Sequence, residues 1–306
     1  MIAFSLLALP VSEVAERAAL ACVPWVGRGA EKRADAAAVE AMRAALNALP
    51  MKGRVVIGEG ERDEAPMLYI GEEVGTGAGP AVDIALDPLE GTTLTAQARA
   101  GALTVLALAP RGALLHAPDV YMEKLAVGPA AAGASLDLGA PVEDTLRAVA
   151  GAVGRPVEDL MVCVLDRERH AGLMADIRAA GARLQLIQDG DVAAVIACAR
   201  GEVDVYMGTG GAPEGVLAAA ALRCTGGAMR GRLVFRNEDE RARAARAGVT
   251  DLARVYTETD MASGDEIIFA ATGVTDGPLV RRGQTLLLTL SGGTPAGRVL
   301  TPAWSS

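Results

Sequence analysis

The sequence has few of the residues that bind soft or borderline metal ions. Its 306 residues include only two histidines, which are too few for a histidine metal site. The cysteines are far apart and form no C-x-x-C pair, and they are Cys22, Cys163, Cys198 and Cys224. This spacing argues against a zinc site and against disulfides. We therefore predict four free, buried thiols, as in proteins of a reducing cytoplasm.

Aromatic residues and long apolar runs are also scarce. Aromatic side chains make up 3% of the chain and hydrophobic residues 51%, so the core must be mainly aliphatic. No run approaches the length of a transmembrane helix. Residues 1–10 are apolar but lack the positive n-region of a signal peptide, and we read them as the start of the fold. The net charge of −9 argues against nucleic acid as a partner, so we predict neither a nucleic-acid nor a membrane partner.

Carboxylates at the ends of predicted strands are the main positive signal. The run Val82–Thr93 is largely apolar up to Asp87, and Pro88 is predicted to end the strand because it has no N–H for the ladder. Glu90 follows, and Gly91 permits a tight turn or the close approach of a ligand. Both carboxylates thus lie near backbone N–H groups that can receive an anion. Hard divalent cations take such oxygen ligands, and phosphoryl transfer uses such cations.

Three further segments each offer a carboxylate in a similar setting. Glu59 and Glu61 follow a β-branched run, on either side of a glycine. Glu214 follows a glycine turn and a proline, at the positive end of a predicted helix. Asp35 lies on an alanine-rich stretch, residues 31–49, that is typical of a helix. Each motif alone is also compatible with a solvated turn, but their combination indicates a metal site.

Longer motifs around these carboxylates resemble one family. The segments are IGEGERDEAPML at 57–68, DPLEGT at 87–92 and GGAPEG at 210–215, with further agreement at 117–125, 169–170 and 189–194. They are similar to the class II (GlpX-type) fructose-1,6-bisphosphatases of the lithium-sensitive, metal-dependent sugar phosphatase superfamily. The likeness runs from about Trp25 to about Gly277. The sequence departs from the family in its shorter, less basic C-terminal segment and at residues 29–31, where the family has Gly-Asp-Lys.

The resemblance implies a fold, a cofactor and a set of site residues. The fold is of mixed α/β (α+β) class, a layered αβαβα sugar-phosphatase fold with two sheet domains, and the cofactor is Mg²⁺ or Mn²⁺. The implied metal ligands are Asp35, Glu59, Asp87, Glu90 and Glu214. The implied catalytic residues are Thr92 and Asp35, which would position or help deprotonate the attacking water. The implied substrate-binding residues are Glu90, Gly91, Thr92, Tyr121, Arg167, Arg169, Asp189, Asp191 and Gly211.

Several of these side chains also have a purely structural interpretation. Thr92 alternatively serves only as a helix N-cap. Arg167 and Arg169 follow a predicted strand end, and guanidinium groups suit a second phosphate, but they are also compatible with a solvated basic turn. Asp191 would accept a sugar hydroxyl or cap the helix that follows it. His170 would bind phosphate, transfer a proton or simply pack.

The function implied by the resemblance is hydrolysis of the 1-phosphate of fructose 1,6-bisphosphate to fructose 6-phosphate and phosphate, in gluconeogenesis or Calvin-type sugar metabolism. Sedoheptulose 1,7-bisphosphate stays open as an alternative or second substrate, since one extra hydroxymethylene changes little in a solvent-facing pocket. Two further alternatives are a superfamily phosphatase for inositol or nucleotide phosphates and a non-catalytic sugar-phosphate sensor. The motifs around Glu90 and Glu214 argue against an inositol or nucleotide phosphatase. The intact set of implied metal ligands argues against a non-catalytic sensor. The expected partner is a sugar bisphosphate, and we expect a homo-oligomer.

Strands and helices alternate along the chain, which predicts a parallel or mixed sheet in the later part. We predict an N-terminal metal-binding α+β domain, residues 1–140, and a C-terminal α/β domain, residues 141–306, that completes the substrate site. The predicted helices are 12–23, 36–49, 142–153, 172–180, 191–199, 214–222 and 237–247. The predicted strands are 54–57, 82–86, 103–109, 161–165, 183–187, 203–207 and 266–271.

Overall fold

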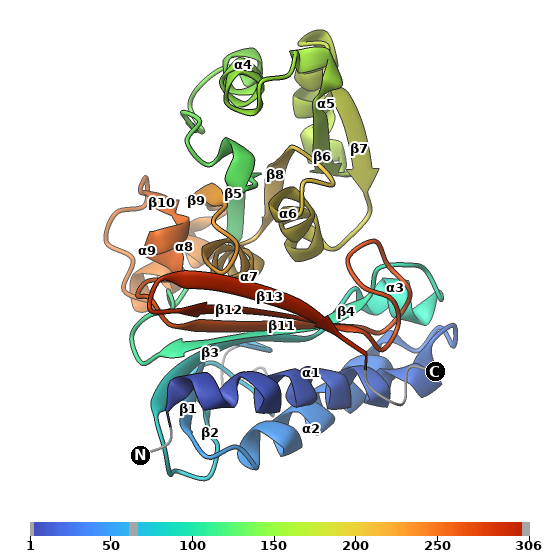
Figure 1. Ribbon diagram of the computed structural model, residues 1–306, viewed down its shortest axis with the longest axis vertical. Coiled ribbons are helices and arrows are strands. Elements are labelled where there is room, and N and C mark those ends of the chain that lie inside the picture. Colours follow the sequence, from blue (N-terminus) through green and yellow to red (C-terminus); the bar gives the residue numbers. More distant parts are fainter. Residues whose placement is uncertain (1–2, 61–66, 302–306) are drawn as a thin grey trace. The chain divides into compact units, whose positions relative to one another are not determined.

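The computed structural model describes residues 3–60 and 67–301, so the predicted Glu61 lies outside the described residues. The chain divides into two compact units: unit 1 comprises residues 1–116 and 262–306, and unit 2 comprises residues 117–261. Each unit has its own sheet with packed helices, which confirms the predicted mixed α/β class with two sheets (Figure 1). None of the described helices is long and apolar enough to cross a membrane.

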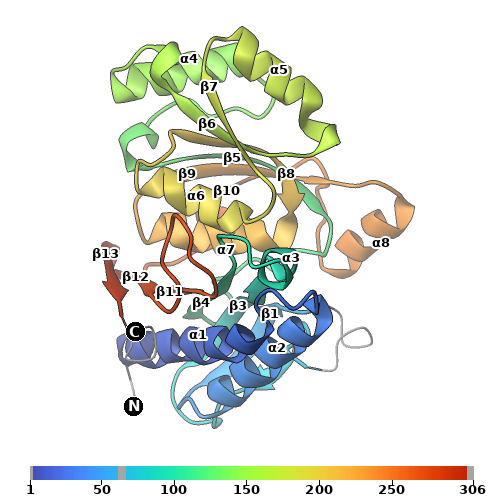
Figure 2. The same cartoon turned by 90° about the vertical axis from the view of Figure 1, so that its right-hand side faces the viewer.

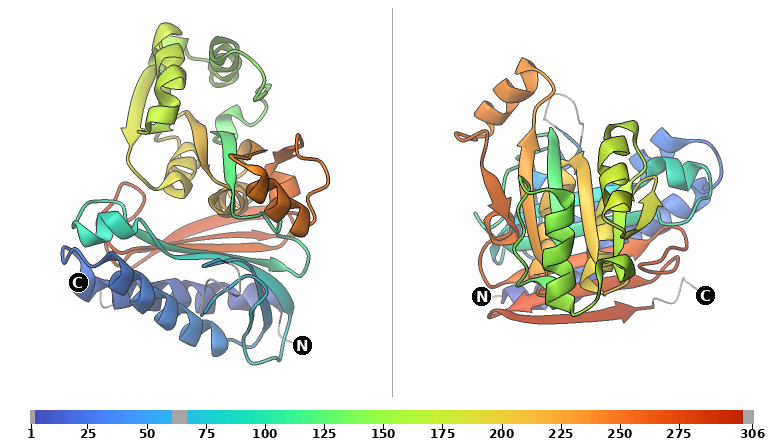
Figure 3. Two further views of the ribbon diagram at one scale, coloured as in Figure 1. Left: turned by 180° about the vertical axis from the view of Figure 1, so that it is seen from behind. Right: turned by 90° about the horizontal axis from the view of Figure 1, so that it is seen from above.

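Unit 1 is a seven-stranded sheet with two long helices packed against it. Helices α1 (Ala8–Cys22) and α2 (Glu31–Asn47) lie side by side on this sheet, shown in blue in Figure 3. In spatial order the strands are β13 (Thr294–Leu300), β12 (Thr285–Ser291), β11 (Ile267–Gly273), β4 (Leu103–Pro110), β3 (Ala81–Glu90), β1 (Lys52–Ile57) and β2 (Glu73–Val74). Strands β1 and β3 pair in parallel, and the other pairings are antiparallel. A short helix, α3 (Thr92–Ala96), follows β3 and packs against α2.

Unit 2 is a six-stranded mixed sheet with helices on both faces. Helices α4 (Val142–Val153) and α5 (Ala171–Ala179) cover one face, and α6 (Asp191–Ala199) and α7 (Ala212–Arg223) cover the other (Figure 2). In spatial order the strands are β10 (Val255–Thr257), β9 (Ala228–Val234), β5 (Tyr121–Val127), β8 (Val205–Gly211), β6 (Met161–Leu165) and β7 (Arg183–Ile187). Two shorter helices, α8 (Glu238–Arg246) and α9 (Glu258–Met261), flank β10 in the sequence.

The unit boundaries differ from the predicted division at residues 140 and 141. Unit 2 begins at Ala117 because β5 pairs with both β8 and β9. The chain returns to unit 1 at Ala262 because β11 pairs with β4 on one side and with β12 on the other. The Gly- and Pro-containing segment at 128–141 is therefore an internal connection of unit 2, between β5 and α4.

The cores of both units are aliphatic, as the composition predicts. In unit 1 the core joins α1 and α2 to the sheet through side chains such as Val14, Met42 and Ile84. In unit 2 a core cluster joins α4 and α5 to the sheet through side chains such as Leu146 and Val162. All four cysteines are buried and free, which confirms the prediction of free thiols.

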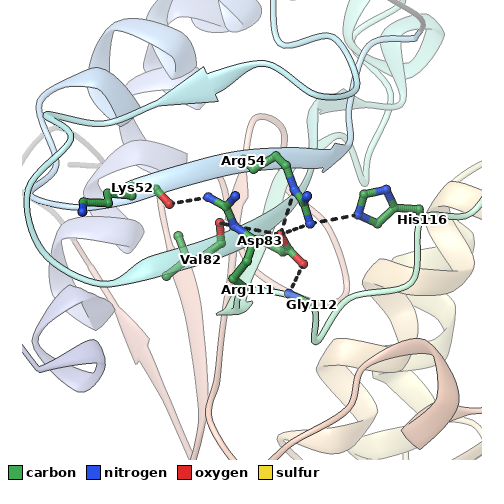
Figure 4. Close-up of polar contacts among 7 residues, drawn as sticks. All are labelled: Lys52, Arg54, Val82, Asp83, Arg111, Gly112 and His116. Carbon is green, nitrogen blue, oxygen red and sulfur yellow. Dashed lines mark hydrogen bonds and ion pairs between the residues drawn. The ribbon is translucent and has the colours of Figure 1, made fainter.

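One buried charge in unit 1 is neutralised by a cluster of basic groups (Figure 4). Asp83 on β3 is fully buried, and its Oδ1 accepts from Arg54 Nη2 at 2.9 Å and lies 3.3 Å from Arg111 Nε. Its Oδ2 accepts from the backbone N–H of Gly112 at 2.6 Å, and Arg54 Nη2 lies 3.3 Å from His116 Nε2. A buried carboxylate needs partners for both of its oxygens, and these contacts provide them. We therefore assign the cluster a structural role: it holds the chain that follows β4 against β3.

Candidate active site

The carboxylate pair at the end of β3 is positioned by a bulge rather than by the end of the strand. Asp87 is opposite Val105 on β4 and Glu90 is opposite Leu103, so β3 has one more residue than β4 between these pairs. Strand β3 continues to Glu90, and the prediction that Pro88 ends it is wrong. Proline is tolerated at a bulge, where its missing N–H is not needed by the ladder.

The turn after β3 depends on a glycine with a left-handed backbone. Gly91 has φ +89° and ψ +50°, and a Cβ at this position would lie 2.9 Å from Leu94 Cδ1. Gly91 is the N-cap of α3, and Thr92 is the first residue of the helix. No side-chain capping hydrogen bond is formed at this helix start among the described residues. The alternative of Thr92 as a simple N-cap is therefore wrong. Thr92 is half-buried and follows the nearly fully buried Glu90 by two residues.

Glu59 and Asp35 carry mutually repelling charges in the same unit. Glu59 follows β1, and its backbone N–H donates to Leu68 O at 3.1 Å. Asp35 is on α2, which packs against both β3 and α3. Burial raises the pKa of Glu59 to about 7, and the charge of Asp35 contributes to the same shift. Burial also raises the pKa of Asp35. Carboxylates held close to one another in this way are stabilised as anions when a cation binds between them.

Glu214 in unit 2 has a buried oxygen that no described side chain or backbone group satisfies. It lies in the first turn of α7, after the N-cap Gly211. A Cβ on Gly211 would lie 2.0 Å from Glu214 Oε2, so this glycine provides the space for the carboxylate. Within residues 3–60 and 67–301, Oε2 has no hydrogen-bond partner. Burial raises the pKa of Glu214, the charge of Asp191 adds to this and Lys124 opposes it. A carboxylate oxygen left in this state suits a metal ligand.

Lys124 is a site residue that the sequence reading did not find. It lies on β5 with only 1% of its surface exposed, and its Nζ is 2.5 Å from Asp191 Oδ2. A Cβ on Gly210 would lie 2.2 Å from that same oxygen, so a glycine is required on β8 beside the pair. Asp191 is the first residue of α6, and Gly190 is the N-cap, so the capping alternative for Asp191 is wrong. The ammonium group neutralises one of the two neighbouring carboxylates and leaves Glu214 as the excess negative charge.

The predicted substrate-binding residues of unit 2 lie at the ends of neighbouring strands. Arg169 donates through Nε and Nη2 to Thr209 O, at 3.0 and 2.6 Å, and its Cζ lies 5.0 Å from the centroid of the Tyr121 ring. Arg167 is exposed, and its charge only partly opposes the rise in the pKa of Asp189 that burial causes. Burial is the largest effect on Asp189 and raises its pKa, and its Oδ1 accepts from Gly190 N–H at 3.1 Å.

His170 has a structural role. Its Nε2 accepts from Thr209 N–H at 2.8 Å, so Nδ1 carries the proton and donates to Leu165 O at 2.7 Å. Burial lowers the pKa of His170, which keeps the ring neutral. With both ring nitrogens bonded to the backbone, the packing interpretation applies, and phosphate binding and proton transfer are excluded in this arrangement. The histidine instead ties the turn that carries Arg169, residues 168–170, to β6 and β8.

The structure places the predicted residues in two groups, one in each unit. Unit 1 carries Asp35, Glu59, Asp87, Glu90, Gly91 and Thr92, whereas unit 2 carries Tyr121, Arg167, Arg169, Asp189, Asp191, Gly211 and Glu214. Among the residues that the structure describes, no three His, Cys, Asp or Glu side chains already form a metal-binding cluster. All the predicted ligands have oxygen donors, and with the unsatisfied Glu214 Oε2 this donor set fits a hard divalent cation.

Comparison with known proteins gives a consistent result over most of the chain. The family model described as bacterial fructose-1,6-bisphosphatase, glpX-encoded, matches residues 5–286, a longer range than the resemblance to residues 25–277. The chain is 50% identical over 289 residues to the fructose-1,6-bisphosphatase 1 class 2 of Escherichia coli (strain K12), covering 90% of this chain and 85% of the relative. It is 46% identical over 301 residues to the D-fructose 1,6-bisphosphatase class 2/sedoheptulose 1,7-bisphosphatase of Synechococcus sp. (strain JA-3-3Ab), covering 90% and 86%.

Proposed function

The chain belongs to the bacterial, glpX-encoded fructose-1,6-bisphosphatase family, a family of metal-dependent phosphoric monoester hydrolases, and from this we propose that it hydrolyses the 1-phosphate of fructose 1,6-bisphosphate. The products are fructose 6-phosphate and phosphate. The observation that carries the proposal is the buried Oε2 of Glu214 at the start of α7, which has no hydrogen-bond partner among the described residues, together with the acidic bulge of β3. Family membership disfavours the inositol, nucleotide and sensor alternatives.

We propose that Asp35, Glu59, Asp87, Glu90 and Glu214 bind Mg²⁺ or Mn²⁺. Such ions stabilise charge on the phosphoryl oxygens and lower the pKa of bound water. The Thr92 hydroxyl positions the attacking water, and Asp35 receives its proton. Gly91 allows the backbone of the turn to approach the phosphate, since no Cβ intervenes. Arg169 orients the far end of the substrate, and Asp189 and Asp191 accept hydrogen bonds from sugar hydroxyls.

Sedoheptulose 1,7-bisphosphate is a second candidate substrate. The Synechococcus relative carries this activity in its name, at 46% identity.

The four free thiols support a reducing compartment, and we propose the cytoplasm. A homo-oligomer and a role in gluconeogenesis or Calvin-type metabolism stay predictions. The decisive assay measures phosphate release from a panel of sugar phosphates in the presence of Mg²⁺ or Mn²⁺, including both bisphosphates, inositol phosphate and a nucleotide phosphate.

Removal of divalent cations is expected to abolish phosphate release from fructose 1,6-bisphosphate. The reason is that the predicted ligands are carboxylates, whose repulsion prevents productive binding of a phosphate dianion unless cations neutralise them. The measurement compares turnover after exhaustive chelation with turnover after Mg²⁺ or Mn²⁺ is restored. Full turnover of the chelated protein would contradict the metal assignment.

The affinity for Mg²⁺ is expected to fall as the pH drops below about 7. Because burial and Asp35 raise the pKa of Glu59 to about 7, a proton competes with the ion below that pH. If one proton is displaced, the loss is roughly tenfold per pH unit. The pKa of Glu59 is 4.5 in the unfolded chain and about 7 in the folded one, so the folded state binds the proton more tightly. The metal-free chain therefore loses stability as the pH rises from 4.5 towards 7. Calorimetric titration with Mg²⁺ on either side of pH 7 tests this, and Glu59→Gln should flatten the profile.

A further inference from the structure

Two arginine side chains lie against the ring of Tyr121. The Cζ of Arg236 lies 4.6 Å from the ring centroid and that of Arg169 lies 5.0 Å from it. The sheet explains how they meet, because Tyr121 at the start of β5 is opposite Val234 at the end of β9, two residues before Arg236. On its other side Tyr121 is opposite Gly211 at the end of β8. Residues from three strand ends thus come together around one aromatic ring.

Arg236 is held in place by a buried carboxylate. Its Nε donates to Glu240 Oε1 at 2.5 Å, and its backbone N–H donates to Glu240 Oε2 at 2.7 Å. Glu240 has only 3% of its surface exposed, and Asn237 Oδ1 accepts from its backbone N–H at 2.9 Å at the start of α8, the orange helix beyond the end of β9 in Figure 2. The hydrogen bond from Arg236 lowers the pKa of Glu240. The guanidinium group is therefore fixed in orientation, although 60% of the side chain is exposed.

The charge around Tyr121 favours an anion. Among the described residues, Arg169 forms no ion pair and donates instead to the neutral carbonyl of Thr209. Arg236 has Glu240 as its partner, and Arg243 pairs with Asp119. One positive charge therefore remains without a carboxylate next to a second, rigidly held guanidinium group. Two planar groups of this kind suit the oxygens of a phosphate, which they bind in preference to a neutral hydroxyl.

We propose that Arg236 acts with Arg169 to bind the remote phosphate of the substrate and so selects bisphosphates over monophosphates. This inference rests on the proposed function, in which the phosphate that reacts lies at the metal carboxylates. Tyr121 serves as the platform that keeps both guanidinium groups in position. The competing interpretation is that Arg236 only anchors α8 to the sheet through Glu240 and Tyr121.

The experiment compares Arg236→Ala with a matched control, Arg241→Ala. Arg241 is also exposed, lies on α8 and pairs with Glu238, but its Cζ lies 5.4 Å from the ring of Phe235, rather than over Tyr121. The first readout is the affinity for fructose 6-phosphate, measured by calorimetry, because this product retains only the remote phosphate. We expect Arg236→Ala to weaken it roughly tenfold or more, Arg169→Ala to do the same, and Arg241→Ala to leave it unchanged.

The second readout is kcat and KM for fructose 1,6-bisphosphate and for fructose 1-phosphate. Arg236→Ala should raise KM for the bisphosphate and leave KM for the monophosphate unchanged. Arg236→Lys keeps the charge without the planar fork, so it should retain part of the preference and also guards against misfolding of the alanine variant. An equal loss on both substrates, or no loss of fructose 6-phosphate affinity in a folded variant, would overturn the assignment. Failure of the proposed function is distinguishable, since the unaltered protein would then release no phosphate from the bisphosphate.

Discussion

Replacing Glu214 by glutamine should lower phosphate release from fructose 1,6-bisphosphate by about 100-fold or more while the protein stays folded. Glutamine keeps the shape of the side chain above Gly211 but removes the ligand charge. Loss of an outer partner of a metal ligand already costs roughly 10- to 100-fold, so loss of a ligand should cost at least as much. The fold should not suffer, because burial raises the pKa of Glu214 and its Oε2 has no hydrogen-bond partner among the described residues.

The measurements are steady-state turnover with saturating Mg²⁺ or Mn²⁺ and the thermal midpoint of the metal-free variant. Glu90→Gln should behave in the same way. The matched control is Glu143→Gln, since Glu143 also lies in the first turn of a helix, α4, but is 58% exposed and pairs with the exposed Arg147. Near-normal turnover of Glu214→Gln with normal metal dependence would show that the ligand assignment is wrong.

Replacing Lys124 by methionine should destabilise the folded chain by about 3–5 kcal/mol. The stem of the side chain is retained, but Asp191 then loses the ammonium group that lies 2.5 Å from its Oδ2. An uncompensated charge remains beside the buried Glu214, and the penalty comes from this charge rather than from lost packing. The free energy of unfolding, measured by chemical denaturation of the metal-free protein, gives the effect.

A double-mutant cycle separates the charge from the packing. Adding Asp191→Asn to Lys124→Met removes the unpaired carboxylate, so the double variant should recover much of the lost stability. Lys32→Met, at an exposed position of α2, controls for the exchange of lysine for methionine and should change stability by less than about 0.5 kcal/mol. A double variant that is no more stable than Lys124→Met would show that the two side chains are not coupled.

Local sequence patterns predicted several elements of unit 2 with the bounds that the structure shows. Helices α4 and α6 and strands β6 and β7 have the predicted bounds, because their apolar periodicity and flanking turn residues agree. The acid-after-strand pattern also placed Glu90 and Glu214 at element ends, as the structure has them, whereas Asp87 lies at the bulge within β3. These features depend on neighbours in the sequence, which is why they can be read from it.

Strands β5 and β9 were not predicted from the sequence, and neither were Lys124 on β5 and Arg236 beyond β9, although Tyr121 on β5 was. Charged side chains interrupt their apolar pattern, but the sheet pairs them: Glu123 on β5 is opposite Arg232 on β9, and their Oε2 and Nη2 atoms are 2.6 Å apart. The importance of Lys124 and of Arg236 follows only from these long-range pairings. In the sequence, a charged side chain that pairs with a residue on a neighbouring strand cannot be told from a surface residue until its partner is known.

Unit 1 is discontinuous in the sequence, and this has a consequence for synthesis on the ribosome. Strand β4 has β11 as its neighbour, and the whole of unit 2 is translated between them. At about 5–20 residues per second, the β4 edge waits roughly ten to thirty seconds for its partner. Unit 2 is continuous and can close before unit 1 does. During that interval the nascent β4, with Val105 and Leu106 in an apolar run, is an exposed edge at which another strand can pair wrongly. We expect a chaperone that binds this segment to prevent such pairing.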